Sequence, residues 1–135
     1  MIELARYVYE NYPNIKTMAP FSQILSLLDR NEEKVVAIKD EKNFKGAAMY
    51  LRITDNSLWK LITGQIKIDN IDDMKNLFEE KGDNIHFIYV LSDSMKTTLR
   101  GLKMVIKKER PHSVSWYKPD MSIHILNLRS EICHQ

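Results

Sequence analysis

IHFIYVLSDSMKTTLRGLKMVIKKER, residues 85–110, is the stretch that decides the fold. Residues 85–91 are apolar at both alternating sets of positions, which is typical of a central strand covered on both faces. The polar turn Ser92-Asp93-Ser94 follows, and Ser94 is placed to accept a hydrogen bond from the amide of Thr97 at the start of a helix. The stretch therefore predicts a strand, a turn and a helix whose first turn attracts anions such as phosphates.

Two stripes run along the predicted helix at helical spacing. The first is apolar and is expected to be buried against the sheet: Met95, Leu99, Leu102 and Ile106. The second is basic and follows one residue later: Lys96, Arg100, Lys103 and Lys107. Gly101 lies inside this helix, where it costs roughly 1 kcal/mol relative to alanine. We therefore expect a packing reason or a ligand at Gly101, whereas the basic stripe alone is also typical of a solvated face.

The length and composition are those of one ordinary soluble domain. A chain of 135 residues can bury a proper core but is too short for two ordinary domains. We expect a single domain over residues 1–128 and a flexible tail over residues 129–135. The net charge of +2 is too small to indicate nucleic-acid binding by itself.

The amino terminus lacks the plan of a signal peptide, and no apolar run approaches the ~20 residues needed to cross a bilayer. Cys133 is the single cysteine and has no partner for an internal disulfide, which fits a reducing compartment. These features predict a cytoplasmic protein that makes no use of a membrane.

Hydrophobic periodicity places the other elements on both sides of the central stretch. Helices are predicted at residues 2–12, 20–31, from the cap Asp55 to the stop at Gly64, and 71–81. Strands are predicted at residues 34–40, 44–54, 113–117 and 122–128. The first two strands form a hairpin, in which Gly46 marks a bulge or a close backbone approach. The predicted fold class is α/β (α+β), with a mixed, mostly antiparallel sheet flanked by helices.

This order of elements resembles the GNAT (Gcn5-related N-acetyltransferase) fold, and in particular the short GNAT-like proteins encoded by bacteriophages. The likeness rests on the hairpin around Gly46, on Arg100-Gly101 in the helix, and on Ser115-Trp116-Tyr117 in the strand that follows it. The family's cofactor pattern of Arg or Gln, two residues, Gly, one residue and Gly or Ala is represented here by Arg100-Gly101 alone.

The resemblance implies an N-acyltransferase that moves an acetyl group from acetyl-coenzyme A to an amine on a small molecule or a protein. The residues it assigns to the coenzyme are Ser92, Asp93, Ser94, Lys96, Thr97, Thr98, Arg100 and Gly101. Tyr89 and Tyr117 are the candidate catalytic residues, because the reaction needs an acid for the departing thiolate. The alternative is a GNAT-like protein without catalysis that binds a protein or a nucleic acid.

Other chemistries have weaker support in the sequence. Four histidines are available as metal ligands, but their spacing matches no known metal motif, and we predict no metal site: His86, His112, His124 and His134. The sequence contains no local signature of a Ser-His-Asp or Cys-His nucleophile. Nucleic-acid binding would use the basic stripe, with Trp116 and Tyr117 as stacking rings, although acidic residues elsewhere nearly cancel its charge.

Overall fold

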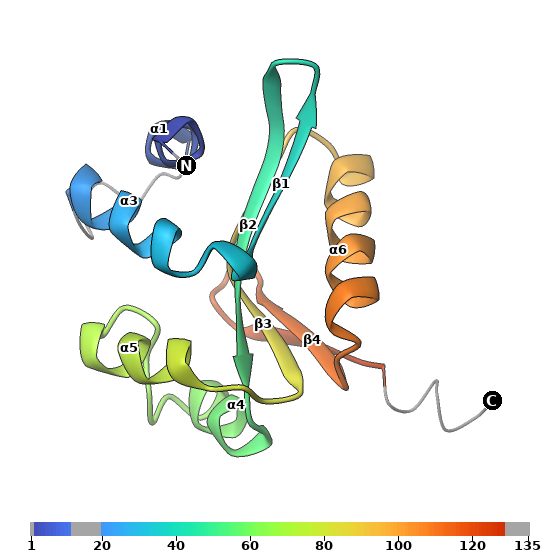
Figure 1. Cartoon of the computed structure of the whole chain (residues 1–135). Helices are drawn as coiled ribbons and strands as arrows, with labels where there is room; N and C mark the ends of the chain where they lie inside the picture. The colour runs from blue at the N-terminus through green and yellow to red at the C-terminus, as the bar shows by residue number, and fades with distance from the viewer. Residues whose placement is uncertain (1, 12–19, 129–135) are drawn as a thin grey trace. The chain divides into compact units, whose positions relative to one another are not determined.

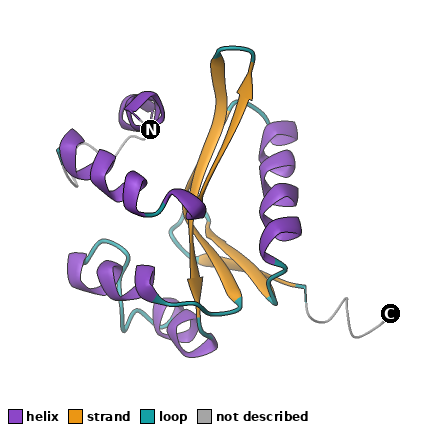
Figure 2. Ribbon diagram, viewed as in Figure 1, coloured by secondary structure: helices purple, strands orange, loops and turns teal. Residues whose placement is uncertain are grey.

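The computed structural model describes residues 2–11 and 20–128, and within these ranges the chain has the predicted α+β fold (Figure 2). Five strands form one sheet in the order β1-β2-β3-β4-β5. The pairs β1–β2 and β4–β5 are antiparallel, and β3–β4 is parallel. Together with five α-helices, this mixed and mostly antiparallel sheet confirms the predicted fold class.

The elements follow the predicted order with small differences at their ends (Figure 1). The helices are α1 (Ile2–Asn11), α3 (Phe21–Arg30), α4 (Asp55–Ile62), α5 (Ile71–Glu79) and α6 (Met95–Glu109), with a 3-10 turn at Glu32–Lys34. The strands are β1 (Val35–Asp40), β2 (Asn43–Ile53), β3 (Asn84–Ser92), β4 (Ser113–Tyr117) and β5 (Ile123–Asn127).

The chain divides into two compact units, the first within residues 1–49 and 90–105 and the second within residues 50–89 and 106–135. Strands β2 and β3 and helix α6 each contribute residues to both units. The single domain expected from the chain length stays a prediction, and the expected tail at 129–135 lies outside the described residues. No helix in the described ranges has the length and apolar character needed to cross a bilayer.

In the first unit, helices α1 and α3 pack together and bury the apolar residues predicted from their spacing. Leu4 and Val8 of α1 are buried, as are Ile24 and Leu28 of α3. The end of the first predicted helix, Tyr12, lies outside the described residues.

The hairpin β1–β2 contains the irregularity expected at Gly46. Ile38 is paired with Gly46 but Lys39 is paired with Phe44, so Lys45 is an extra residue in β2. A side chain at position 46 would also place its Cβ only 2.8 Å from the carbonyl oxygen of Leu91. Both predicted reasons for a glycine, a bulge and a close backbone approach, are therefore confirmed.

Helix α6 buries a different face from the predicted one. Met95 and Leu99 are 71% and 48% exposed, and Leu102 and Ile106 are only half-buried. The buried residues are instead Gly101 and Val105. An added Cβ at Gly101 would lie 3.9 Å from Cγ1 of Ile38 in β1, so the small residues of α6 face the hairpin (Figure 1). The apolar-stripe prediction was wrong, because a helix that lies close to a strand packs small residues inward.

In the second unit, the burial of β3 and the cap of α4 also differ from expectation. Asn84–Phe87 are buried, but β3 loses its cover toward its end, and Val90, which begins the part of β3 in the first unit, is 44% exposed. The cap of α4 is Thr54, whose side chain accepts a hydrogen bond from the amide of Ser57 at 3.1 Å. Asp55, the predicted cap, is the first helical residue, and its carboxylate accepts from Nδ2 of Asn84 at 2.8 Å.

Candidate functional site

The turn between β3 and α6 has the capping geometry expected from the sequence. The amide of Thr97 donates to Oγ of Ser94 at 3.2 Å, which confirms the predicted cap. The hydroxyl of Thr98 donates to the carbonyl oxygen of Ser94 at 3.2 Å, and the hydroxyl of Ser92 donates to the same oxygen at 2.6 Å. The turn is thus held by its own hydroxyl groups, and it brings together most of the predicted coenzyme residues.

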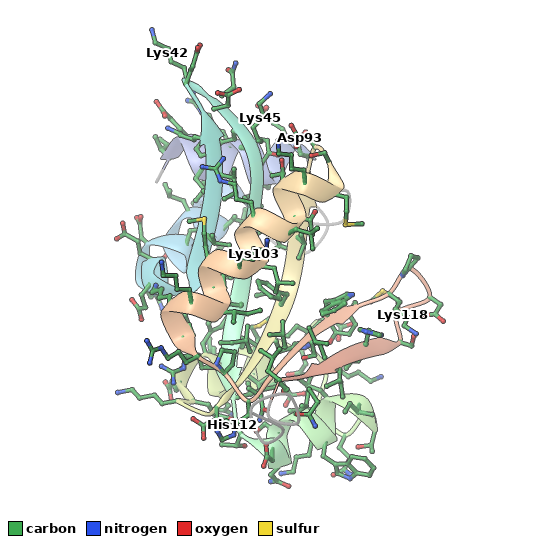
Figure 3. The ribbon with its side chains drawn as sticks, turned by 90° about the vertical axis from the view of Figure 1, so that its right-hand side faces the viewer. Lys42, Lys45, Asp93, Lys103, His112 and Lys118 are labelled. Carbon is green, nitrogen blue, oxygen red and sulfur yellow. The ribbon has the colours of Figure 1, made fainter. Side chains whose placement is uncertain are left out.

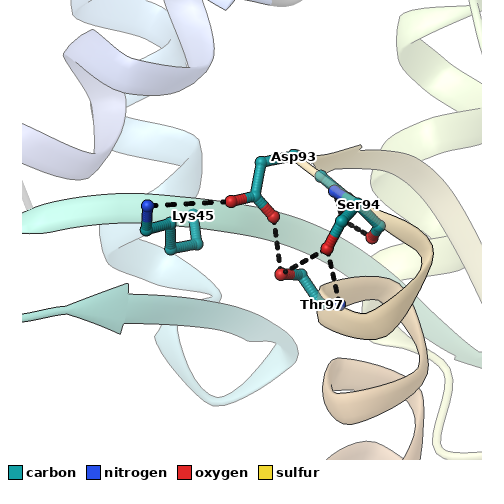
Figure 4. A network of polar contacts seen from close by, with 5 residues as sticks. Lys45, Asp93, Ser94 and Thr97 are labelled. Atoms are coloured by element: carbon teal, nitrogen blue, oxygen red, sulfur yellow. Dashed lines mark hydrogen bonds and ion pairs between the residues drawn. The ribbon is translucent and has the colours of Figure 1, made fainter.

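Asp93 adds a carboxylate to this turn (Figure 4). Its Oδ1 accepts from the hydroxyl of Thr97 at 2.6 Å, its Oδ2 lies 3.8 Å from Nζ of Lys45, and its amide donates to the carbonyl oxygen of Lys45 at 2.9 Å. The Thr97 hydrogen bond, helped by Ser94 and by the charge of Lys45, lowers the pKa of Asp93 below its usual value. An ionised carboxylate therefore lies where the positive end of the α6 dipole attracts anions.

Lys45 is a residue of this turn that the sequence did not indicate. It lies 48 residues before Asp93 in the chain, and the bulge beside Gly46 places it at the turn (Figure 3). Only the absence of a side chain at Gly46 allows β2 to approach Leu91 and Thr97 this closely. The signal in the sequence was Gly46 itself, which marked the approach but not the residue that it brings to the turn.

The remaining predicted coenzyme residues separate onto two sides of α6. Lys96 and Arg100 are exposed. Gly101 is buried and faces Ile38, so the Arg100-Gly101 pair does not act as one motif on a ligand surface. The reason for this glycine is packing against β1, which is one of the two reasons expected from the sequence.

The two candidate catalytic tyrosines belong to the second unit and follow the point where β3 and β4 stop pairing. The parallel ladder consists of three pairs, from Asn84 with Ser113 to His86 with Ser115. Tyr89 lies three residues beyond His86, and Tyr117 lies two residues beyond Ser115. Both tyrosines are half-buried. The edge of Tyr117 meets the ring of His86 at 5.0 Å between ring centroids.

His86 and Ser115 form a buried polar pair at the end of this ladder. Both side chains are 0% exposed, and Nδ1 of His86 lies 2.7 Å from Oγ of Ser115. Ser115 Oγ also donates to the carbonyl oxygen of Ile85 at 3.4 Å, so we assign the proton of the imidazole to Nδ1. The other ring nitrogen, Nε2, is buried and has no hydrogen-bond partner among the described residues. Burial lowers the pKa of His86 to about 4.

A second polar pair lies one step earlier on the same strands. Ser113 donates to Oδ1 of Asn84 at 2.7 Å, and Nδ2 of Asn84 donates to Asp55 at 2.8 Å. Neither pair was predicted from the sequence, because each residue is separated from its partner by 29 positions. The available signal was the alternation of polar residues at 84 and 86 and at 113 and 115.

The histidines do not gather into a metal site in the part of the chain that the structure describes, where no cluster of potential ligands is found. His112 lies 4.0 Å from a carboxylate oxygen of Asp83, and the ring of His124 lies against Trp116. His134 is outside the described residues.

Comparison with known proteins gives no relative from which a function could be transferred. No protein-family model matches the chain, and no curated protein or solved structure matches it either. The function is therefore argued from the chain's own geometry.

Proposed function

We propose that this protein is a GNAT-like N-acyltransferase of the cytoplasm that binds acetyl-coenzyme A and acylates an amine. The observation that carries the proposal is the early end of the parallel ladder between β3 and β4. Parallel neighbours normally satisfy the N–H and C=O groups of each other along their whole length. Here β3 continues past His86 and β4 past Ser115 without such pairing between them.

An extended ligand that carries amide groups suits this opening. A peptide-like chain can add to an exposed strand edge through main-chain hydrogen bonds, as a further strand would. The pantetheine arm of coenzyme A is extended and contains amides, so Phe87, Ile88 and Trp116 are the residues that we expect to pair with it. Its thioester would then lie on the strands that carry Tyr89 and Tyr117.

The proposed chemistry uses one of these tyrosines as a general acid. Acetyl-coenzyme A supplies the activated acetyl group. The amine nitrogen forms the new bond to the acetyl carbon, the carbon–sulfur bond breaks, and the phenolic proton of Tyr89 or Tyr117 goes to the departing thiolate. Each tyrosine follows the opening directly in its own strand, and the choice between them is left to the Tyr→Phe variants.

The phosphates of the coenzyme would lie at the turn Ser92–Thr98. The first-turn amides of α6 and the exposed cations Lys96 and Arg100 support this placement. The carboxylate of Asp93 opposes it, because it already occupies the hydroxyl of Thr97. A phosphate therefore competes with Asp93 for this end of the helix.

Calorimetry with acetyl-coenzyme A tests the proposal before any acceptor is known. We expect saturable binding, and weaker binding of free pantetheine, which lacks the nucleotide and its phosphates. Tyr89→Phe and Tyr117→Phe should bind the coenzyme normally, and one of them should lose acyl transfer to a panel of amines. A folded wild-type protein that gives no heat with ~1 mM acetyl-coenzyme A, far above the usual range for substrates, would contradict the proposal.

The second candidate is a GNAT-like protein without catalysis that binds a protein or a nucleic acid. It is favoured by one observation, the completeness of the turn in Figure 4, where Asp93, Ser94, Thr97 and Lys45 satisfy one another. Such a turn is stable with no phosphate present. Absence of coenzyme binding in the calorimetric experiment would favour this candidate.

A further inference from the structure

A line of exposed basic side chains runs along the outward side of α6. Its members fall within about 60° of one another around the helix axis, on the side away from the buried Gly101 and Val105. Figure 3 shows one of them, Lys103, midway along the helix. We call the four residues the α6 basic face: Lys96, Arg100, Lys103 and Lys107, all exposed.

The charge of this face is not neutralised by neighbouring side chains. None of its four residues makes an ion pair with any residue from the ranges 2–11 and 20–128. The one acid of α6, Glu109, is half-buried, and its Oε2 lies 3.3 Å from Nε of Arg52. The helix has five basic residues, counting Lys108, against this single acid. The whole chain has a net charge of only +2, so positive charge is concentrated on α6.

We propose that the α6 basic face binds the phosphate backbone of a nucleic acid. This goes beyond acyl transfer and does not rest on it. A helical rise of 1.5 Å per residue places Lys96 and Lys107 about 16 Å apart along the axis. One strand of duplex DNA presents about five phosphates over that length, at roughly 3.4 Å each. Four evenly spaced cations therefore match a regular line of phosphates nearly one to one.

The order of residues around the helix favours a nucleic acid over a membrane surface. A helix that lies on a membrane turns a continuous apolar face toward the lipid and carries its cations on the opposite, polar face. On α6 the cations occupy the middle of the outward side, and exposed apolar residues lie beside them, with Met95 and Leu99 on one flank and Met104 on the other. Binding to lipid would press the cations, rather than the apolar residues, into the hydrocarbon.

Fluorescence anisotropy with a labelled DNA duplex tests this proposal. Four phosphate contacts predict that log K falls with log salt with a slope of about −3.6. Lys103→Gln/Lys107→Gln should reduce the slope to about −1.8 and weaken binding about a hundredfold at ~50 mM salt. The matched control is Lys67→Gln/Lys75→Gln, which removes two exposed lysines elsewhere and should behave as wild type.

Two further measurements separate a loss of this face from unfolding and from damage to the proposed acyl-transfer site. Equal thermal unfolding of both double variants shows that the fold is kept. Unchanged affinity of Lys103→Gln/Lys107→Gln for acetyl-coenzyme A shows that the coenzyme site, which uses neither lysine, is intact.

Several results would overturn the proposal. The first is absence of duplex binding by the wild type at ~50 mM salt, where non-specific electrostatic binding is strong. The second is an equal loss of binding in the test and control variants, because net charge alone would then be responsible. Competition by poly-glutamate as strong as by DNA would instead assign the face to an acidic protein. Preferential binding to vesicles with anionic headgroups would assign it to a membrane.

Discussion

Acid should destabilise this protein through His86, and the size of the effect follows from its burial. The pKa of His86 is about 4 in the folded chain, against 6.5 for an unperturbed histidine. The unfolded chain therefore binds a proton at a higher pH than the folded chain does. Stability due to neutral His86 is fully present above pH 6.5, falls as the pH drops toward 4, and changes no further below that.

The loss works out at about 3 kcal/mol, using roughly 1.4 kcal/mol for each pH unit between the two pKa values. Its physical origin is the buried Nε2, because a proton there would be a charge without a hydrogen-bond partner in the described residues. This is a large part of the 5–15 kcal/mol that typically holds a domain together.

Urea unfolding of the wild type and of His86→Gln between pH 7.5 and pH 4.5 measures the effect. His86→Gln will lower stability at neutral pH, because it disturbs the contact with Ser115, but it cannot titrate. The difference in unfolding free energy between wild type and variant should therefore shrink by about 2–3 kcal/mol across this range. Parallel pH profiles for the two proteins would refute the assignment of a neutral, buried His86.

The other predictions concern the turn and its supports. Arg100→Ala should weaken acetyl-coenzyme A binding by roughly 1–3 kcal/mol in calorimetry, as expected for a bond to a charged group, whereas Lys107→Ala on the same stripe should change it little. Asp93→Asn should tighten that binding, since it removes the negative charge that competes with phosphate, and a weaker affinity would mean that Asp93 supports the site. Gly46→Ala should destabilise the fold by about 1–3 kcal/mol through its contact with Leu91. Gly101→Ala should instead stabilise it by up to ~1 kcal/mol, because its Cβ has room beside Ile38, and urea unfolding of both glycine variants decides whether the two signs are opposite.

Local sequence signals predicted the elements of this fold well, because they act over a few residues. The cap at Ser94 depends only on the next three positions, and it was found where expected. Gly46 was correctly associated with a bulge and a close approach, because a glycine weakens a strand unless the backbone needs the missing side chain there. The strand at Ser113–Tyr117 was predicted with its observed ends.

Signals that depend on distant partners were not readable in the same way. The buried face of α6 was predicted from its large apolar residues, but the closeness of β1 selects Gly101 and Val105 instead. The ion pair of Lys45 with Asp93 depends on the bulge in a different strand. The contact of His86 with Ser115 depends on the register of two parallel strands, which no local pattern fixes. Each of these features needed the tertiary structure.

The measurement that tests the central proposal most directly is a titration of the ¹⁵N-labelled protein with acetyl-coenzyme A, followed by NMR through its backbone amides. We predict that the largest shifts fall on Phe87–Tyr89 and Trp116–Tyr117, beyond the end of the β3–β4 ladder, and on the turn Ser92–Thr98. Saturation of these shifts with one affinity would support a single bound coenzyme. A spectrum unchanged at ~1 mM coenzyme, or shifts confined to other segments, would contradict the proposal that this fold binds acetyl-coenzyme A.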